Sequence, residues 1–193
     1  MPPKAKFTRE EIIAAALEIV RDRGFDALTA RALGERLGSS ARPIFTMFCS
    51  MEEVQEEARA AARVLYNSYV EEALHGKEVN VPHFKCVGQQ YIRFAASEPK
   101  LFQLLFMKEQ EQMPDFQNVL PLIETNYEDI LVSIEEEYKV GRSLSLRLYR
   151  HLWVYTHGIA TLCATRMCGF TVEEISVMMT EIFKSLLKEM KND

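Results

Sequence analysis

The sequence predicts an all-α protein, and three observations support this fold class. Apolar residues recur at helical spacing through almost the whole chain, and no run alternates apolar and polar residues for long enough to form a strand. Three segments, FTREEI, CSMEEV and FTVEEI, carry the hydroxyl and the glutamate of a capping box, which marks the start of a helix. Helix breakers, among them Gly24, Pro99 and Pro114, separate the periodic segments. We expect about nine helices.

The first three expected helices are short and close together in the sequence. They cover about 9–23, 29–37 and 40–47. Thr29 caps the second helix, and Gly38 supplies the turn that follows it, where a positive φ is easily adopted by glycine. Gly34 stands one turn earlier, where a small residue lets two helices cross closely. Helices this short are marginal alone in water, so the pair is typical of a helix-turn-helix that presents one helix to a partner.

The later expected helices are longer. They cover about 50–75, 82–96, 99–108, 117–138, 144–168 and 172–190. We therefore expect two domains, a three-helix helix-turn-helix domain over residues 1–49 and a second helical domain over residues 50–193.

Composition limits the classes of function. The chain has 193 residues, a hydrophobic share of 48% and a formal net charge of -5, which argues against a generally basic nucleic-acid coat protein. Residues 1–50 nevertheless hold eight lysines and arginines against six acidic residues, so the turn motif lies in a basic part of the chain. No secretory leader or membrane-spanning run stands out, which indicates a cytoplasmic protein. Free thiols are expected for the four cysteines, with a metal or redox site as the alternative, and we expect no metal and no cofactor.

The outward face of the third expected helix is small and polar. Its members are Ser40, Ala41, Arg42, Thr46 and part of Phe45. Such a face suits a DNA major groove, where Arg42 can read guanine or hold a phosphate. Thr29 begins a helix, and a helix N-terminus also binds phosphate. The alternative for these residues is a solvated surface with a capping role.

These segments resemble the TetR family of bacterial transcriptional repressors. The resemblance rests on the N-terminal helix, on GFDALTARALGERLG followed by IFTMF, and on the capped SMEEV that opens a long helix. It covers about residues 8–60, and WVYTHGIATL is similar to the Trp-x-x-x-His-Gly segment of one C-terminal subfamily. The resemblance implies a homodimer that binds a palindromic operator in double-stranded DNA and responds to a small-molecule effector.

The chain departs from the family pattern at several positions near the third helix. Phe45 stands where the family usually has a tyrosine that contacts phosphate, Met47 where it usually has histidine, and Met51 where it often has lysine. Ser39 replaces a residue that is usually apolar. Because phosphate contacts supply much of the affinity for DNA, we expect weaker or more salt-sensitive binding, or compensation from the N-terminal arm. The arm residues in question are Lys4, Lys6 and Arg9, of which Lys6 is the candidate DNA contact.

The resemblance also implies that the second domain binds the effector. Aromatic residues and methionines are dense between Tyr91 and Met167, and such residues line small-molecule sites as well as ordinary cores. The candidate ligand-binding residues are Phe102, Phe106, Tyr127, Trp153 and His157. For His157 the alternatives are a core histidine that bonds a backbone carbonyl and a metal ligand.

The last helix carries a wide apolar stripe, which the family pairs with a partner subunit. The candidate dimer-interface residues are Met178, Met179, Ile182, Phe183, Leu186 and Leu187. The alternative is that the stripe belongs to the core of its own subunit.

The sequence therefore predicts a ligand-responsive transcriptional regulator that acts as a repressor and is released from DNA by an apolar or amphipathic effector. A helical adaptor or ligand-binding protein with little affinity for DNA is the main alternative, which the departures at Phe45 and Met51 favour. An enzyme is not expected, because the chain contains no G-x-S-x-G, P-loop, H-E-x-x-H or G-x-G-x-x-G motif.

Overall fold

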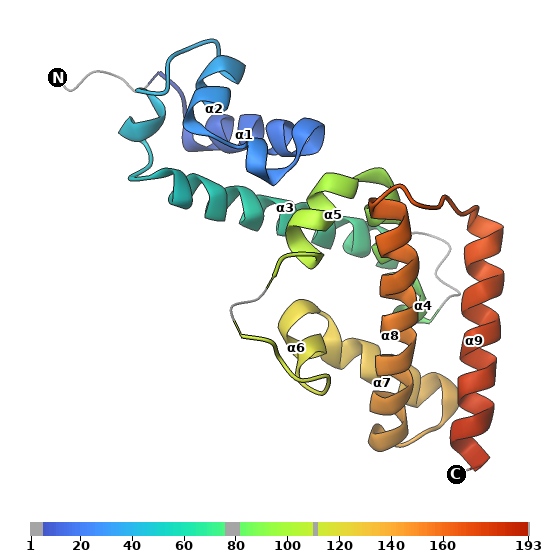
Figure 1. Ribbon diagram of the computed structural model, residues 1–193. Coiled ribbons are helices and arrows are strands. Elements are labelled where there is room, and N and C mark those ends of the chain that lie inside the picture. Colours follow the sequence, from blue (N-terminus) through green and yellow to red (C-terminus); the bar gives the residue numbers. More distant parts are fainter. Residues whose placement is uncertain (1–5, 76–81, 110–111, 193) are drawn as a thin grey trace. The chain divides into compact units, whose positions relative to one another are not determined.

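The computed structural model describes residues 6–75, 82–109 and 112–192, and the described chain is all-helical. Its α-helices are α1 (Arg9–Arg23), α2 (Ala30–Arg36), α3 (Met51–Leu74), α4 (His83–Ser97), α5 (Pro99–Phe106), α6 (Val119–Ile123), α7 (Tyr127–Tyr138), α8 (Arg142–Ala164) and α9 (Val172–Asn192), shown in Figure 1. Two 3-10 turns, η1 (Phe25–Ala27) and η2 (Ile44–Thr46), lie between the first helices. The predicted all-α class is confirmed, and these segments contain no strand.

The predicted capping boxes form at two of the three helix starts. At α1, the Glu11 amide donates to the Thr8 hydroxyl over 3.2 Å and the Thr8 amide donates to the Glu11 carboxylate over 2.8 Å. Thr171 and Glu174 make the same pair of bonds before α9. At α3 the pattern is altered, because the Glu53 carboxylate accepts from the amide of Cys49, one residue before the expected position.

Two expected helices are wrong. Residues 40–47 form only the η2 turn, because Pro43 has no amide to donate and disfavours helical geometry at the residue before it. The expected helix over 117–138 is divided into α6 and α7, because the chain turns at Glu124, whose backbone is extended and whose side chain is buried. The Glu124 carboxylate then accepts from the amide of Asn126 over 3.4 Å, which stabilises the turn.

The chain divides into two compact units, Met1–Ser68 with Glu98–Lys108 and Tyr69–Ser97 with Glu109–Asp193. This division by packing differs from the expected boundary after residue 49, and the assignment of separate functions to residues 1–49 and 50–193 stays a prediction. The helix α3 passes from the first unit into the second without a break.

The first unit is built around α1, α2, the greater part of α3, and α5. Its core consists of small and branched apolar side chains, among them Ile12, Ala16, Ile19, Leu33, Ile44, Phe48 and Val54. The α5 segment joins this core beside α1, where the Arg21 guanidinium donates to the Glu98 carboxylate over 2.9 Å.

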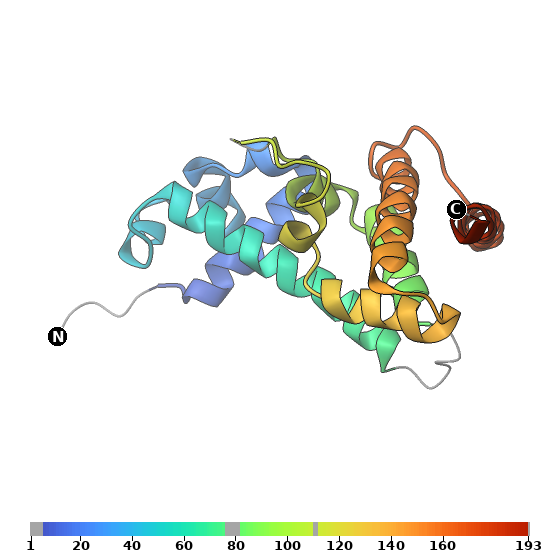
Figure 2. The same cartoon turned by 90° about the horizontal axis from the view of Figure 1, so that it is seen from below.

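The second unit is built around α4, α7, α8 and α9. The helices α8 and α9 follow one another in the chain and pack against each other (Figure 1), and Figure 2 shows them inclined, with α9 seen end-on and α8 seen along its length. The side chains of Phe94, Ile130, Ile134 and Leu148 are fully buried between α4, α7 and α8. In the described ranges, no helix is both long enough and apolar enough to cross a membrane.

Candidate functional site

The turn after α2 is shaped by two glycines. Gly38 has a φ of 61°, which supports the predicted positive-φ turn. A Cβ atom on Gly34 would lie 2.9 Å from the backbone nitrogen of Ala41 and from the carbonyl carbon of Ser40. The predicted close approach at Gly34 is therefore present, although a turn rather than an α-helix crosses it.

The segment 40–48 is a short 3-10 turn with a defined shape. Ile44 is fully buried and anchors it, whereas Phe45 keeps 46% of its surface exposed. The Thr46 hydroxyl donates to the carbonyl oxygen of Pro43 over 2.6 Å. The proton of Thr46 is thus used within the turn, and this hydroxyl can only accept from an incoming donor.

The arginines around the turn differ in what they contact. Arg31 pairs with Glu35, and Arg36 pairs with Asp22, a neighbour on α1. Arg42 is exposed and has no ion-pair partner among the described residues. It is therefore the arginine of residues 28–48 whose guanidinium is available to an external anion or base.

The remaining predicted contacts of the turn are surface residues. Thr29 is exposed, and its hydroxyl accepts from the Ala32 amide over 3.2 Å, as predicted for a cap. Ser40 is exposed and Ala41 is half-buried. Lys6 donates to the Ser39 hydroxyl over 3.0 Å, which holds the arm beside the turn. Lys4 lies outside the described residues.

Arg9 has a structural role that the sequence did not reveal. Its guanidinium donates to the carbonyl oxygen of Met47 over 2.5 Å, binds the carboxylates of Glu53 and Glu57, and lies 4.1 Å from the ring centroid of Phe48. These carboxylates raise the pKa of Arg9 above its ordinary value, Glu57 most strongly. These contacts hold the Arg9 guanidinium against α3 and the turn, and its expected compensation for lost phosphate contacts stays a prediction.

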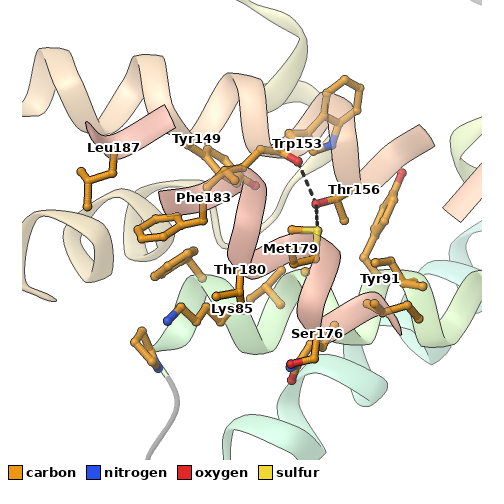
Figure 3. Close-up of a pocket in the computed structure, with 18 of the residues that line it drawn as sticks. Lys85, Tyr91, Tyr149, Trp153, Thr156, Ser176, Met179, Thr180, Phe183 and Leu187 are labelled. Carbon is orange, nitrogen blue, oxygen red and sulfur yellow. Dashed lines mark hydrogen bonds between the residues drawn. The ribbon is translucent and has the colours of Figure 1, made fainter. Parts of the chain in front are cut away.

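A cavity of about 530 Å³ lies in the second unit between α4, α8 and α9. Figure 3 shows the labelled residues around it, with Lys85 and Tyr91 from α4, Tyr149, Trp153 and Thr156 from α8, and Ser176 to Leu187 from α9. Most of its walls are aromatic or aliphatic, with a few hydroxyls and two lysines, Lys85 and Lys184. An apolar cavity with few polar groups is typical of a small-molecule site.

The polar groups of this cavity are held by specific contacts. The Thr156 hydroxyl donates to the Leu152 carbonyl over 2.8 Å and lies 3.7 Å from the sulfur of Met179 (Figure 3). Burial and the nearby Glu124 carboxylate raise the pKa of Tyr149 well above its ordinary value, which keeps this phenol neutral. A neutral phenol can donate a hydrogen bond to a ligand.

His157 does not line the cavity itself, but it contacts two residues that do. Its Nδ1 lies 2.8 Å from the Tyr91 hydroxyl, and its ring stacks on Trp153 with centroids 5.0 Å apart. Burial lowers the pKa of His157, so the ring is held in its neutral form. The Tyr91 hydroxyl is one partner of this ring, and both Tyr91 and Trp153 line the cavity.

The five predicted ligand-binding residues do not come together. Trp153 lines the cavity, and His157 and Tyr127 contact residues that do, Tyr127 through a ring contact with Tyr149. Phe102 and Phe106 instead belong to α5 in the first unit, where their rings pack against one another with centroids 5.0 Å apart. Phe102 is fully buried. These two phenylalanines form part of the core of the first unit.

The predicted interface residues of α9 divide between two environments. Met179, Phe183 and Leu187 line the cavity, and the Phe183 ring lies 4.6 Å from the ring centroid of Tyr138. Phe183 is 7% exposed, so it belongs to the core of its own subunit. Met178, Ile182 and Leu186 are half-buried and do not line this cavity.

The principal cavity residues that the sequence reasoning missed lie on α4 and α9. Phe84, Gly88 and Tyr91 recur at helical spacing on α4, and this spacing was the signal available for them. On α9 the signal was the apolar stripe itself, which a cavity wall and a subunit interface share.

Comparisons with known proteins agree with this architecture. Residues 12–58 match the family model of bacterial regulatory proteins, tetR family. A solved structure of a TetR family protein from Vibrio parahaemolyticus is similar to the chain with a TM-score of 0.60 and 15% sequence identity, over 91% of this chain and 96% of that one. No curated protein matches the sequence.

Proposed function

Since the chain belongs to the TetR family of bacterial regulatory proteins and is a transcriptional regulator, we propose that it is a homodimeric repressor that releases its operator when a small molecule binds. The family match covers the turn motif and the start of α3. The parts of the proposal that go further are DNA contact through the turn, an effector in the cavity, and pairing through α8 and α9.

The observation that carries the proposal is the exposed guanidinium of Arg42, which has no ion-pair partner among the described residues, whereas Arg31 and Arg36 on the preceding helix α2 are paired. An arginine without an internal partner can make bidentate contact with guanine or phosphate. Ser40 and Thr29 are exposed as well. The lysine at position 6 is tied to Ser39, so its charge is held beside the same surface.

The effector role is supported by the shape and composition of the cavity. It is large enough for a drug-sized molecule and has aromatic walls with a few hydroxyl groups. Because α3 belongs to both units, a ligand that changes the second unit can act on the first through a continuous helix. The ligand shifts the regulator only to the extent that its affinities for the two states differ.

Dimerisation is supported by apolar surface on the last two helices. Val154 on α8 is 50% exposed, and Met178, Ile182 and Leu186 on α9 are only half-buried within one subunit. Gly158, also on α8, is exposed, and an added Cβ there would meet no atom within 4 Å. Both features fit a surface on which a second copy of the chain can pack closely.

The test of the proposal is DNA binding at graded salt concentration, with random duplex DNA and with an operator selected from a random pool. A repressor shows tighter binding to the selected site and a steep fall of affinity with salt on both DNAs, since each phosphate contact releases counterions. The adaptor alternative, favoured by the exposed Phe45 and the 3-10 turn, shows no binding to either DNA. That outcome would remove the regulatory proposal.

A further inference from the structure

A second cavity adjoins the first along α4. It has a volume of about 560 Å³ and lies between the C-terminal half of α4, the segment after α8 and the start of α9. The two cavities adjoin one another, with Gln89, Ile92 and Ile175 in both walls, and together they are named the α4 groove. The groove follows α4 from Pro82 to Ser97, about 22 Å at the rise of an α-helix. Such a groove accommodates an elongated molecule.

The far end of this groove is cationic. Arg93 and Arg166 line the second cavity, and none of the described residues in its wall is acidic. The guanidinium of Arg93 lies 5.8 Å from the Tyr69 ring centroid, and neither arginine makes an ion pair with a described residue. The nearby Glu174 carboxylate is bound to the Thr171 amide over 2.8 Å. Both guanidinium groups are thus available to an anion.

Arg166 is kept in a strained backbone conformation. It has a φ of 57° directly after α8, and its amide donates to the Cys163 carbonyl while the Met167 amide donates to the Leu162 carbonyl, both over 3.0 Å. This helix ending usually has glycine at the left-handed position, because a side chain there is disfavoured. Arg166 therefore keeps its side chain at a position where glycine would be less strained, and this side chain lines the second cavity.

An unpartnered polar atom lies in the same wall. The Gln90 side-chain oxygen is buried, and the described residues provide no hydrogen-bond partner for it. Since the oxygen and nitrogen of an amide can exchange places by a flip, Gln90 can present either a donor or an acceptor to a bound head group.

We propose that this groove binds an amphipathic anion of the long-chain carboxylate class, with its hydrocarbon between Met179 and Phe183 and its carboxylate on Arg93 and Arg166. The inference rests on the proposed function, for which it names the effector class. The opposite end of the groove is less suited to the carboxylate. There the Lys85 ammonium already lies 5.5 Å from the Phe183 ring centroid, and Glu124 stands in the wall. Two guanidinium groups offer the planar donor pairs that match a carboxylate.

The test uses Trp153, the single tryptophan of the chain and part of the groove wall, as a fluorescent reporter. Laurate, palmitate and the uncharged hexadecanol are titrated below their aggregation limits into the full-length protein. Arg166→Gly should weaken palmitate binding roughly 10- to 100-fold, as expected for lost charge-assisted hydrogen bonds. Hexadecanol binding should stay within about 2-fold, since an uncharged head group loses no ion pair.

The matched control is Lys139→Gly. Lys139 is also a basic residue with positive φ, 52°, after a helix of the same unit, but it lines neither cavity. Both substitutions remove one positive charge and relieve a left-handed conformation, so both variants should melt at or above the wild-type temperature. Only Arg166→Gly should lose affinity for palmitate.

Three results overturn the inference. They are equal affinity for palmitate and hexadecanol, loss of palmitate binding on Lys85→Ala or Lys184→Ala but not on Arg166→Gly, and no binding of either carboxylate. If neither carboxylate binds but the operator still does, the proposed regulatory function is retained and only the proposed class of effector is rejected. If palmitate binds through Arg166 but leaves operator affinity unchanged, the ligand site stands and the effector role fails.

Discussion

Arg9 and Met47 are joined by a hydrogen bond of 2.5 Å from the guanidinium of α1 to the last carbonyl of the η2 region. The same guanidinium binds Glu53 and Glu57 on α3, so one side chain connects the first helix, the turn and the long helix. A fork of five donors can make these contacts together, and an ammonium group cannot.

Arg9→Lys should therefore loosen the turn while keeping the charge. We expect faster hydrogen exchange at the amides of residues 44–48 and weaker binding to specific and random DNA alike. Arg31→Lys is the control, because the Arg31–Glu35 pair is exposed and such pairs contribute little. Unchanged exchange in Arg9→Lys would show that the turn is held by its own bonds.

Arg42→Ala tests whether the turn over residues 40–48 contacts DNA. If Arg42 contacts a base, the substitution should weaken binding to the selected operator by roughly 1–3 kcal/mol and leave random DNA unaffected. An equal loss on both DNAs reassigns Arg42 to a phosphate, and no loss removes it from the site. Arg36→Ala is the comparison in the same titration, because the guanidinium of Arg36 is already paired with the Asp22 carboxylate in the wild-type protein.

Two neighbours on α9 should behave differently when changed. Phe183→Ala removes a ring that packs on Tyr138 and Phe84, and we expect a loss of stability of roughly 3 kcal/mol in chemical denaturation. Ile182→Glu places a charge on the surface proposed to pair, and sedimentation should show monomers with helical content retained.

Val177→Glu controls for the added charge, since Val177 is 56% exposed and outside the predicted interface. Dimers that persist in Ile182→Glu would place the interface elsewhere, and unfolding would assign Ile182 to the core.

His157 should make the second unit sensitive to acid. Its pKa is lowered by burial in the folded protein, so the unfolded chain binds more protons as the pH falls below about 6.5. Stability from this group is complete above the unfolded pKa and is lost as the pH falls through the folded pKa. Melting temperatures between about pH 7.5 and pH 5 should show the loss.

His157→Gln keeps a partner for the Tyr91 hydroxyl but does not titrate, so this part of the pH dependence should disappear. A variant with the same acid sensitivity as the wild type would assign the effect to other groups.

The sequence predicted the elements that depend on local chemistry. The boxes at Thr8 and Thr171 and the cap at Thr29 involve residues three apart, and the structure confirms them. The expected helix over residues 40–47 does not form, because Pro43 has no amide to donate and disfavours helical geometry at the residue before it.

The sites were harder to predict, because they depend on contacts between distant segments. Of the predicted ligand-binding residues, Trp153 lines the cavity of the second unit, whereas Phe102 and Phe106 lie on α5, which packs into the first unit. An aromatic residue at helical spacing has the same appearance in a core and in a cavity wall. The Arg9 contacts join residues 38 to 48 positions apart, and periodicity carries no information about such pairs.

Gly34→Ala should disturb the turn directly. The new methyl group would meet the backbone of Ser40 and Ala41, which cannot move as a flexible side chain can, and we expect a loss of about 1–3 kcal/mol with loss of DNA binding. Gly141→Ala is the control, since its methyl group would meet nothing within 4 Å and the substitution should change stability by less than about 1 kcal/mol. If Gly34→Ala retained full stability, the backbone of Ser40 and Ala41 would be able to move away from the added methyl group at little cost.

The close approach of the turn backbone to Gly34 affects which residues of the turn can be substituted without changing its geometry. The backbone of residues 39–41 rests on a position without a side chain, so the height of the turn is set by α2 and not by the side chains of the turn itself. Ser40 and Arg42 point to solvent from this support. Substitutions at these two positions can therefore change the chemistry of the exposed surface in single steps, while the backbone geometry of the turn is kept and no compensating mutation in the core is required.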